Sequence, residues 1–155
     1  MAGKIDAHIK SLGLNLPAAP TPVANYVPYV RTGNLVFVSG QIPLENGVVK
    51  YVGLVGAQVS PEEGYEAAKL CGLNLIAQVK AACDGDLDRV TRVVKLTGFV
   101  AAGATFTEQP KVMNGASDLM VQVFGDAGRH CRAAVGSSSL PRGAAVEVEG
   151  VFEVS

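Results

Sequence analysis

Tryptophan is absent from the sequence, and phenylalanine and tyrosine bring the aromatic share to only 6%. Charged residues are also scarce, at 17% of the chain against 48% for apolar residues, whereas glycine is plentiful. A monomer of this composition would expose an unusual amount of apolar surface. The composition therefore predicts an oligomer in which another subunit covers part of that surface.

Clusters of like charge are absent as well. The chain has 13 basic and 14 acidic residues, a net charge of −1, and no run of five or more like charges. Because nucleic-acid binding draws on clustered lysine and arginine, we expect no nucleic-acid partner. The same balance gives no indication of a membrane partner.

Long apolar runs are missing, since none approaches the length of a membrane span. The first 16 residues are interrupted by Lys4, Asp6 and Lys10, so they lack the unbroken apolar centre of a secretory signal. We therefore expect a cytoplasmic protein.

The cysteines do not show the spacing of a metal site. Cys71, Cys83 and Cys131 are odd in number and form no CxxC pair, whereas disulfide frameworks and zinc sites usually show close or paired spacing. We expect buried, reduced thiols, no metal and no cofactor.

The common hydrolase and nucleotide-binding signatures (GxSxG, HExxH, the Walker loop and GxGxxG) are missing too. His8 and His130 are the two histidines, and His8 is interpreted as a helix-surface residue. A Cys131 nucleophile with His130 as its base is disfavoured, because neighbouring residues of a strand point to opposite faces.

The first half of the chain predicts a short helix, an extended segment and a hairpin. Apolar spacing indicates a helix over about residues 3–13 that stops at Gly13, followed by a proline-rich extended segment over residues 16–28. Two β-rich runs, residues 34–39 and 48–55, flank an Asn-Gly pair, so we expect them to form an antiparallel hairpin.

The second half mixes helices and strands. Ser60-Pro61-Glu62-Glu63 carries both halves of a capping box and begins a helix that continues to about Ala82. Strands are expected at residues 90–101, 133–135 and 144–154, with a helix at 113–124 and a break in the alternation of the last strand at Gly150-Val151. This order predicts a single α+β domain over residues 1–155, with the helices packed on one face of the sheet.

Arg132 and Glu147 are the two residues that the sequence pattern by itself marks as candidates for a chemical role. An arginine offers a planar fork that matches a carboxylate, and a glutamate can position water or transfer a proton. Spacing does not distinguish this arrangement from an ordinary structural contact between two strands.

Two motifs are specific. Ser39-Gly40-Gln41-Ile42-Pro43 resembles the SGQIP signature of the RidA/YjgF family, and Arg132, Leu140-Pro141 and Val146-Glu147-Val148-Glu149 resemble its C-terminal signature. The resemblance runs from about Pro22 to the C-terminus. It implies a chorismate mutase-like fold with a mixed β-sheet, a homotrimer with sites in the clefts between subunits, and hydrolysis of reactive enamines and imines, such as 2-aminoacrylate, to 2-oxo acids and ammonia.

The resemblance also implies roles for single residues. Arg132 matches the arginine that holds the substrate carboxylate, and Glu147 matches the glutamate that orients water or transfers a proton. Tyr26, Asn114 and Gly40 match residues that line the substrate site. The structural alternatives are a packed aromatic for Tyr26, a helix cap for Asn114 and a turn residue for Gly40.

The sequence departs from the family pattern at several places, as a longer, divergent subgroup would. Ala134 stands where the deaminase branch often has cysteine, residues 136–139 are small, and the N-terminal helix is additional. These changes alter the pocket walls, so a non-catalytic module that binds a small carboxylate or 2-oxo acid is the alternative. The ribonuclease (endoribonuclease L-PSP) or translation-inhibitor label of some members is disfavoured by the net charge of −1.

Overall fold

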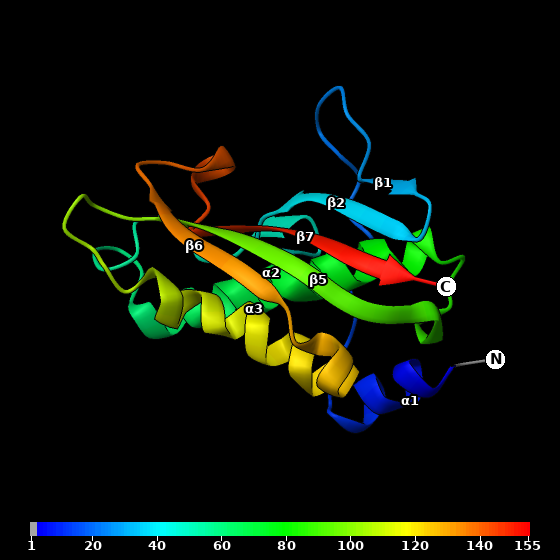
Figure 1. Cartoon of the computed structure of the whole chain (residues 1–155). Coiled ribbons are helices and arrows are strands. Elements are labelled where there is room, and N and C mark those ends of the chain that lie inside the picture. Colours follow the sequence, from blue (N-terminus) through cyan, green and yellow to red (C-terminus); the bar gives the residue numbers. More distant parts are fainter. Residues whose placement is uncertain (1–2) are drawn as a thin grey trace.

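The computed structural model describes residues 3–155 and has a mixed β-sheet with its helices on one face (Figure 1). In chain order the main elements are α1 (Lys4–Ser11), β1 (Tyr29–Thr32), β2 (Leu35–Gln41), β3 (Leu44–Glu45), β4 (Val48–Val49), α2 (Pro61–Ala82), β5 (Val90–Ala101), α3 (Gln109–Phe124), β6 (Cys131–Ser137) and β7 (Val146–Val154). Short 3-10 turns lie at Leu87–Arg89, Gly125–Gly128 and Pro141–Gly143. The expected α+β architecture is confirmed.

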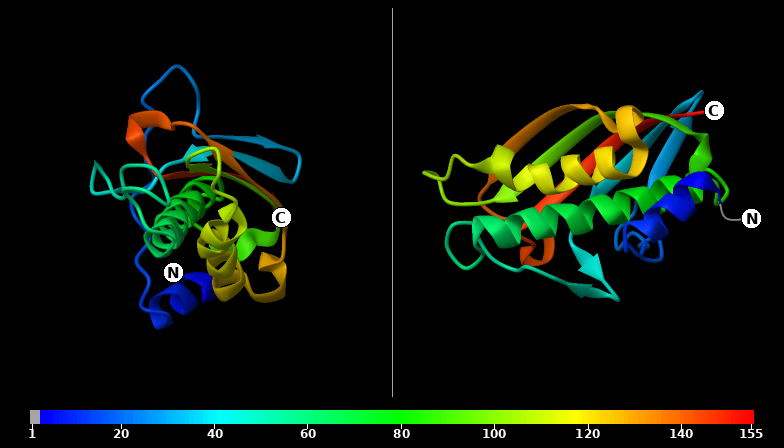
Figure 2. Two further views of the ribbon diagram at one scale, coloured as in Figure 1. Left: turned by 90° about the vertical axis from the view of Figure 1, so that its left-hand side faces the viewer. Right: turned by 90° about the horizontal axis from the view of Figure 1, so that it is seen from below.

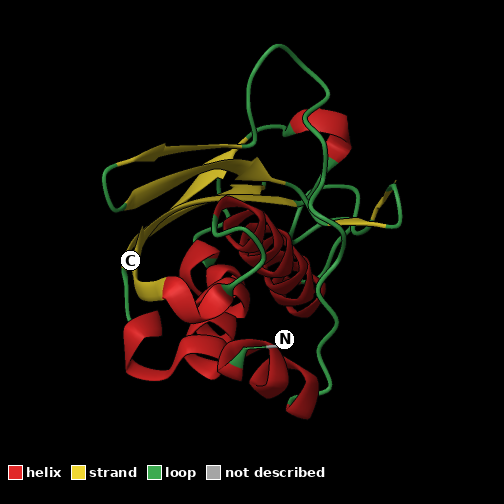
Figure 3. Ribbon diagram, turned by 90° about the vertical axis from the view of Figure 1, so that its right-hand side faces the viewer, coloured by secondary structure: helices red, strands yellow, loops and turns green. Residues whose placement is uncertain are grey.

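The large sheet has the strand order β1-β2-β7-β5-β6, in which only the β5–β6 pair is parallel. Helices α2 and α3 run side by side under it, and α1 lies below them (Figures 2 and 3). The described part of the chain contains no helix that is both long and apolar enough to cross a membrane.

Helix α2 begins where the capping box predicts. The Glu63 main-chain N–H donates to Ser60 Oγ, and the Ser60 N–H donates to the Glu63 carboxylate. Its close contact with α3 depends on Gly115, because a Cβ at that position would overlap the main-chain oxygen of Tyr65. The two helices therefore approach backbone to backbone beneath the sheet.

Strand β7 provides the centre of the core. Val146, Val148, Phe152 and Val154 are fully buried on the helix side, and Gly150 continues the same alternation. The expected break in phase at Gly150-Val151 was therefore wrong. The irregularities lie in the partner strands instead, between Val90 and Lys95 of β5 and between Val38 and Gln41 of β2.

The predicted hairpin between residues 34–39 and 48–55 was also wrong. Asn46 and Gly47 adopt positive φ values of 51° and 78°, so their tight turn joins only the adjacent short strands β3 and β4. Tyr51, with φ of 58°, prevents β4 from continuing. Strand β2 pairs instead with β1 and β7, and β1 was not predicted because it directly follows the proline-rich segment.

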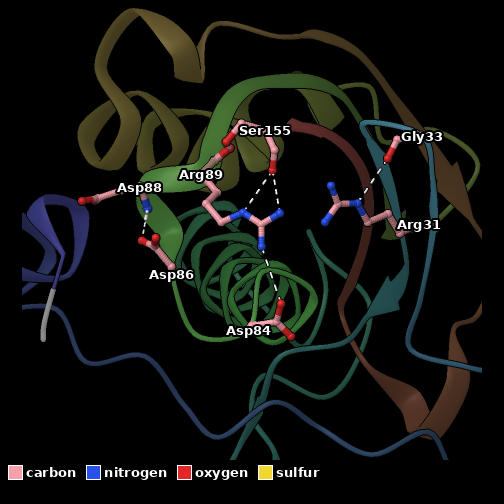
Figure 4. Close-up of polar contacts among 7 residues, drawn as sticks. All are labelled: Arg31, Gly33, Asp84, Asp86, Asp88, Arg89 and Ser155. Carbon is pink, nitrogen blue, oxygen red and sulfur yellow. Dashed lines mark hydrogen bonds and ion pairs between the residues drawn. The ribbon is translucent and has the colours of Figure 1, made fainter.

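Polar contacts hold the two chain ends to the body of the protein. Asp88 accepts hydrogen bonds from the N–H groups of Lys4 (2.9 Å) and Ile5 (2.8 Å) at the start of α1. Arg89 donates two hydrogen bonds to the main-chain oxygen of Ser155 at 3.0 and 2.6 Å (Figure 4). Asp88 thus caps a helix that is distant in the sequence.

We expect Asp88→Ala to lower the Tm by roughly 2–4 °C, the usual scale for one lost helix cap in a protein of this size. The two N–H donors hold the pKa of Asp88 below its ordinary value. Because the folded-state pKa is the lower one, the stabilisation is complete above the unfolded pKa of about 3.9 and disappears as the pH falls through the folded value. The difference in Tm between wild type and variant should therefore shrink below about pH 4.

Thermal unfolding followed by circular dichroism from pH 7 to pH 3 measures this difference. Asp126→Ala is the matched control, because its carboxylate is fully exposed and pairs only with Arg129. A difference in Tm that stays constant down to pH 3 would contradict the capping role.

Candidate functional site

A small pocket lies beside the irregular part of β2 and contains three of the predicted site residues. Tyr26, Gly40 and Glu147 line it, together with other residues from segments 20–28, 40–44 and 141–147. Its volume of about 120 Å³ is well below the ~300–1,000 Å³ of pockets for drug-sized ligands. The pocket is of a size to hold a small molecule rather than a polymer.

Gly40 gives the Glu147 carboxyl group its space. Gly40 lies inside β2 at an irregularity in its pairing with β7. Val38 and Gln41 are three residues apart on β2, whereas their partners Gly150 and Val148 are only two residues apart on β7. A Cβ at position 40 would overlap Oε1 of Glu147. A side chain at position 40 would thus force the Glu147 carboxyl group to move, and the role of this glycine is to leave space for that group and not to form a turn.

Glu147 is half-buried, and its surroundings disfavour the charged form. Burial raises the pKa of its carboxyl group, and the nearby Glu149 carboxylate raises it further. A carboxyl group with a raised pKa stays protonated up to a higher pH than an exposed glutamate does. It is therefore suited to proton transfer.

Arg132 lies elsewhere, on the side of β6 that faces α3. Its Nη1 donates to Asn114 Oδ1 at 2.9 Å and to Ser117 Oγ at 3.1 Å, and its Nη2 donates to the Pro110 carbonyl at 3.3 Å. A guanidinium group has five N–H donors, so Nε–H and one Nη2–H have no partner within residues 3–155. These contacts fix the side chain and leave donors for a carboxylate.

His130 supports this arginine through Ser117. His130 Nδ1 lies 2.7 Å from the Gly128 carbonyl, which can only accept, so Nδ1 carries the proton. In the neutral ring, Nε2 then accepts from the Ser117 hydroxyl at 2.8 Å, while the same oxygen accepts from Arg132. His130 is thus engaged with the arginine and not with its neighbour Cys131.

Cys131 lies on the outer face of the edge strand β6, and its thiol donates to the Val94 carbonyl at 3.2 Å. The expectation that all three cysteines are buried holds for Cys71 and Cys83 but was wrong for Cys131, which is exposed. The difference arises because none of the elements within residues 3–155 covers the outer side of this strand.

The structure sorts the predicted residues into two groups. Arg132 is in register with Leu96 of β5, whereas Glu147 is in register with Phe99, three residues further along. Residues an odd number apart on a strand point to opposite faces, and Leu96 is the one buried against the helices. One chain therefore places Arg132 and Glu147 on opposite faces of its sheet.

The alternative interpretations of two residues do not hold. Asn114 lies within the second turn of α3 and not at its cap, and its amide oxygen binds Arg132. Tyr26 is exposed and lines the pocket, so it is not a packed core aromatic.

Sequence reasoning missed two buried amides of α2 that hold the pocket walls. Asn74 Nδ2 donates to the carbonyls of Ile42 (3.1 Å) and Leu44 (3.0 Å), and Gln78 Nε2 donates to the Pro20 carbonyl at 2.6 Å. Both side chains are essentially inaccessible to solvent. Their signal in the sequence was two amides four residues apart on the apolar side of a helix.

Known proteins resemble the chain over nearly its whole length. The family model described as "YjgF/chorismate mutase-like, putative endoribonuclease" matches residues 6–151. Protein TCP17 of Trypanosoma cruzi is 48% identical over 99% of this chain and 96% of its own. The crystal structure of Atu1372 from Agrobacterium tumefaciens, a protein of unknown function, is 50% identical, covers 97% of this chain and 92% of its own, and has a TM-score of 0.91.

A more distant relative has a named activity. The 2-iminobutanoate/2-iminopropanoate deaminase of Dermatophagoides farinae is 27% identical over 91% of this chain and 94% of its own. The similar proteins thus include a deaminase at low identity and a protein of unknown function at high identity.

Proposed function

The chain belongs to the YjgF/RidA family, whose fold is chorismate mutase-like, and we propose that it hydrolyses reactive imines and enamines to 2-oxo acids and ammonia. The observation that carries the proposal is the Glu147 carboxyl group, with its raised pKa, above the open backbone of Gly40 in a small pocket. The deaminase of Dermatophagoides farinae supports the same reaction class.

The proposed site is shared between copies of the chain. Because Arg132 and Glu147 lie on opposite faces of one sheet, a neighbouring copy has to supply the arginine that accompanies Glu147. The outer face of the sheet offers apolar contacts for such a neighbour, with Val30, Phe37 and Val135 exposed at 52%, 45% and 45%. We propose a homotrimer that buries this face.

In the proposed reaction, the free donors of Arg132 bind the substrate carboxylate and fix the position of the C=N carbon. Glu147 in its protonated form donates to the imine nitrogen, and then as a carboxylate it accepts a proton from the attacking water. A C–O bond forms and the C=N double bond becomes single. Glu147 then donates its proton to the nitrogen of the carbinolamine, the C–N bond breaks as the hydroxyl group loses its proton to the Glu147 carboxylate and becomes the carbonyl, and ammonia and the 2-oxo acid are released.

The test is ammonia release and 2-oxo acid formation from imines that an amino-acid oxidase generates in the presence of the purified protein. We expect the wild type to accelerate hydrolysis and Gly40→Ala to lower kcat/KM by about 10-fold or more, because the added methyl group displaces the Glu147 carboxyl group from its place. The matched control is Gly103→Ala, since a Cβ at that position meets nothing within 4 Å.

Other outcomes have definite meanings. Saturable binding of 2-oxo acids without any turnover would replace the deaminase proposal with the carboxylate-binding module. Equal activity of Gly40→Ala and Gly103→Ala would show that the reaction does not depend on the place that the Glu147 carboxyl group takes above Gly40.

A further inference from the structure

Arg142 is a cation in the Glu147 pocket to which the proposed reaction gives no role. It lines the same pocket as Glu147 and Gly40, in the short 3-10 turn Pro141–Gly143. Five ion pairs are formed within residues 3–155, and Arg142 takes part in none of them. A guanidinium group with its donors unused therefore stands at a pocket wall.

The backbone of Arg142 is held in an uncommon conformation. Its φ of 57° and ψ of 21° lie in the left-handed region, which residues with a side chain rarely adopt. The turn is fixed from outside, because the Gly53 N–H donates to the Gly143 carbonyl at 2.9 Å and Ala144 forms a bridge with Val52. Such conformations cluster at functional sites, where the surrounding structure imposes them.

Apart from Arg142 and Glu147, the pocket lining carries no charged side chain within residues 3–155. Proline and aliphatic side chains such as Pro20, Val23 and Ile42 form much of the lining. Arg142 itself is exposed to solvent, which screens its charge, so its selectivity for an anion depends on a direct contact and not on burial. Arg142 also forms no ion pair with Glu147, so a ligand does not have to break one in order to reach it.

We propose that Arg142 binds a second acidic group of the ligand, so that the pocket prefers short dicarboxylic imino and 2-oxo acids to those with a neutral side chain. This inference rests on the proposed function, in which Arg132 of a neighbouring copy holds the first carboxylate and Glu147 acts at the C=N carbon. The two arginines then match the two carboxylates of the ligand. The part of the pocket that one chain supplies is small, so the part of the ligand that reaches Arg142 is short.

Equilibrium binding of stable 2-oxo acids tests the inference without requiring turnover. Isothermal titration calorimetry compares 2-oxoglutarate with 2-oxobutanoate, which lacks the second carboxylate. We expect the wild type to bind 2-oxoglutarate about 5–10-fold more tightly, the upper range for a charge-assisted contact made by an exposed arginine. Arg142→Ala should bring the two affinities within about 3-fold of each other, mainly by weakening 2-oxoglutarate.

Two further variants separate binding from folding. Arg142→Gly removes the side chain and also suits the left-handed backbone, so it should lose the preference without a fall in Tm. Arg142→Lys keeps the charge but not the planar fork and should retain part of the preference. Equal wild-type affinities for the two acids, or a preference that survives in both Arg142→Ala and Arg142→Gly, would overturn the inference.

The calorimetry and the ammonia-release assay together distinguish this inference from the deaminase proposal. A wild type that prefers 2-oxoglutarate but hydrolyses no imine would retain the role of Arg142 and remove the catalytic one. A wild type that hydrolyses neutral imines and binds 2-oxoglutarate and 2-oxobutanoate equally well would keep the deaminase proposal and remove the role of Arg142.

Discussion

Replacing Arg132 with alanine is expected to lower kcat/KM for imine hydrolysis by about 10²–10³-fold, the cost of losing a charged partner of the substrate carboxylate. The side chain is held by Asn114, Ser117 and Pro110, so its free donors are already oriented before the substrate arrives. The loss should therefore appear in both KM and kcat, because alanine neither attracts the carboxylate nor positions the C=N carbon.

Two variants serve as controls for Arg132→Ala. Arg132→Lys keeps the charge but cannot make the same set of contacts, so we expect it to recover only part of the activity. Arg129→Ala removes a guanidinium group from the same open surface, where Arg129 pairs with Asp126, and should stay within about 2-fold of wild type. Wild-type kcat/KM in a correctly folded Arg132→Ala protein would place the carboxylate elsewhere.

Glu147→Gln should lower kcat by about 10²–10⁴-fold and leave KM nearly unchanged, the range expected for the loss of a general acid–base group. Glutamine fills the same space above Gly40, so the pocket keeps its shape while proton transfer is lost. Steady-state kinetics with imines generated in situ measure this effect. An unchanged kcat would show that Glu147 transfers no proton.

The pH profile adds a test with a definite sign. Burial and the Glu149 carboxylate raise the pKa of Glu147, so Glu149→Gln should lower that pKa. The limb of the kcat profile that belongs to Glu147 should then move to lower pH in Glu149→Gln and vanish in Glu147→Gln. A limb that stays in place in both variants would belong to another group.

The sequence was most informative where the determinants are local. The capping box at Ser60 and Glu63 marked the start of α2, and the alternation of apolar and acidic residues marked β7. Helix α3 starts at Gln109, four residues before the predicted 113, because a proline in the first turn suits a helix start that apolar spacing does not reveal.

Features that depend on distant partners were not predictable in the same way. Local spacing in β6 and β7 does not show that Arg132 and Glu147 point to opposite faces, since this depends on the register of both strands with β5. The hairpin was misassigned because the Asn-Gly turn is local, whereas the choice of partner for β2 is made by β1 and β7. The exposure of Cys131 follows from the place of β6 at the sheet edge.

Helix α2 holds the pocket walls in a way that leaves their side chains free to diverge in evolution. Asn74 and Gln78 bind the carbonyl oxygens of residues 20, 42 and 44, and every type of amino acid has that group. Mutations at the three wall positions therefore change the surface that a ligand meets without removing the hydrogen bonds that hold the wall. The two anchors lie on helix α2, whereas the wall positions lie on two separate segments, one before β1 and one from the end of β2 into β3, so natural selection can change ligand preference while the architecture stays constant.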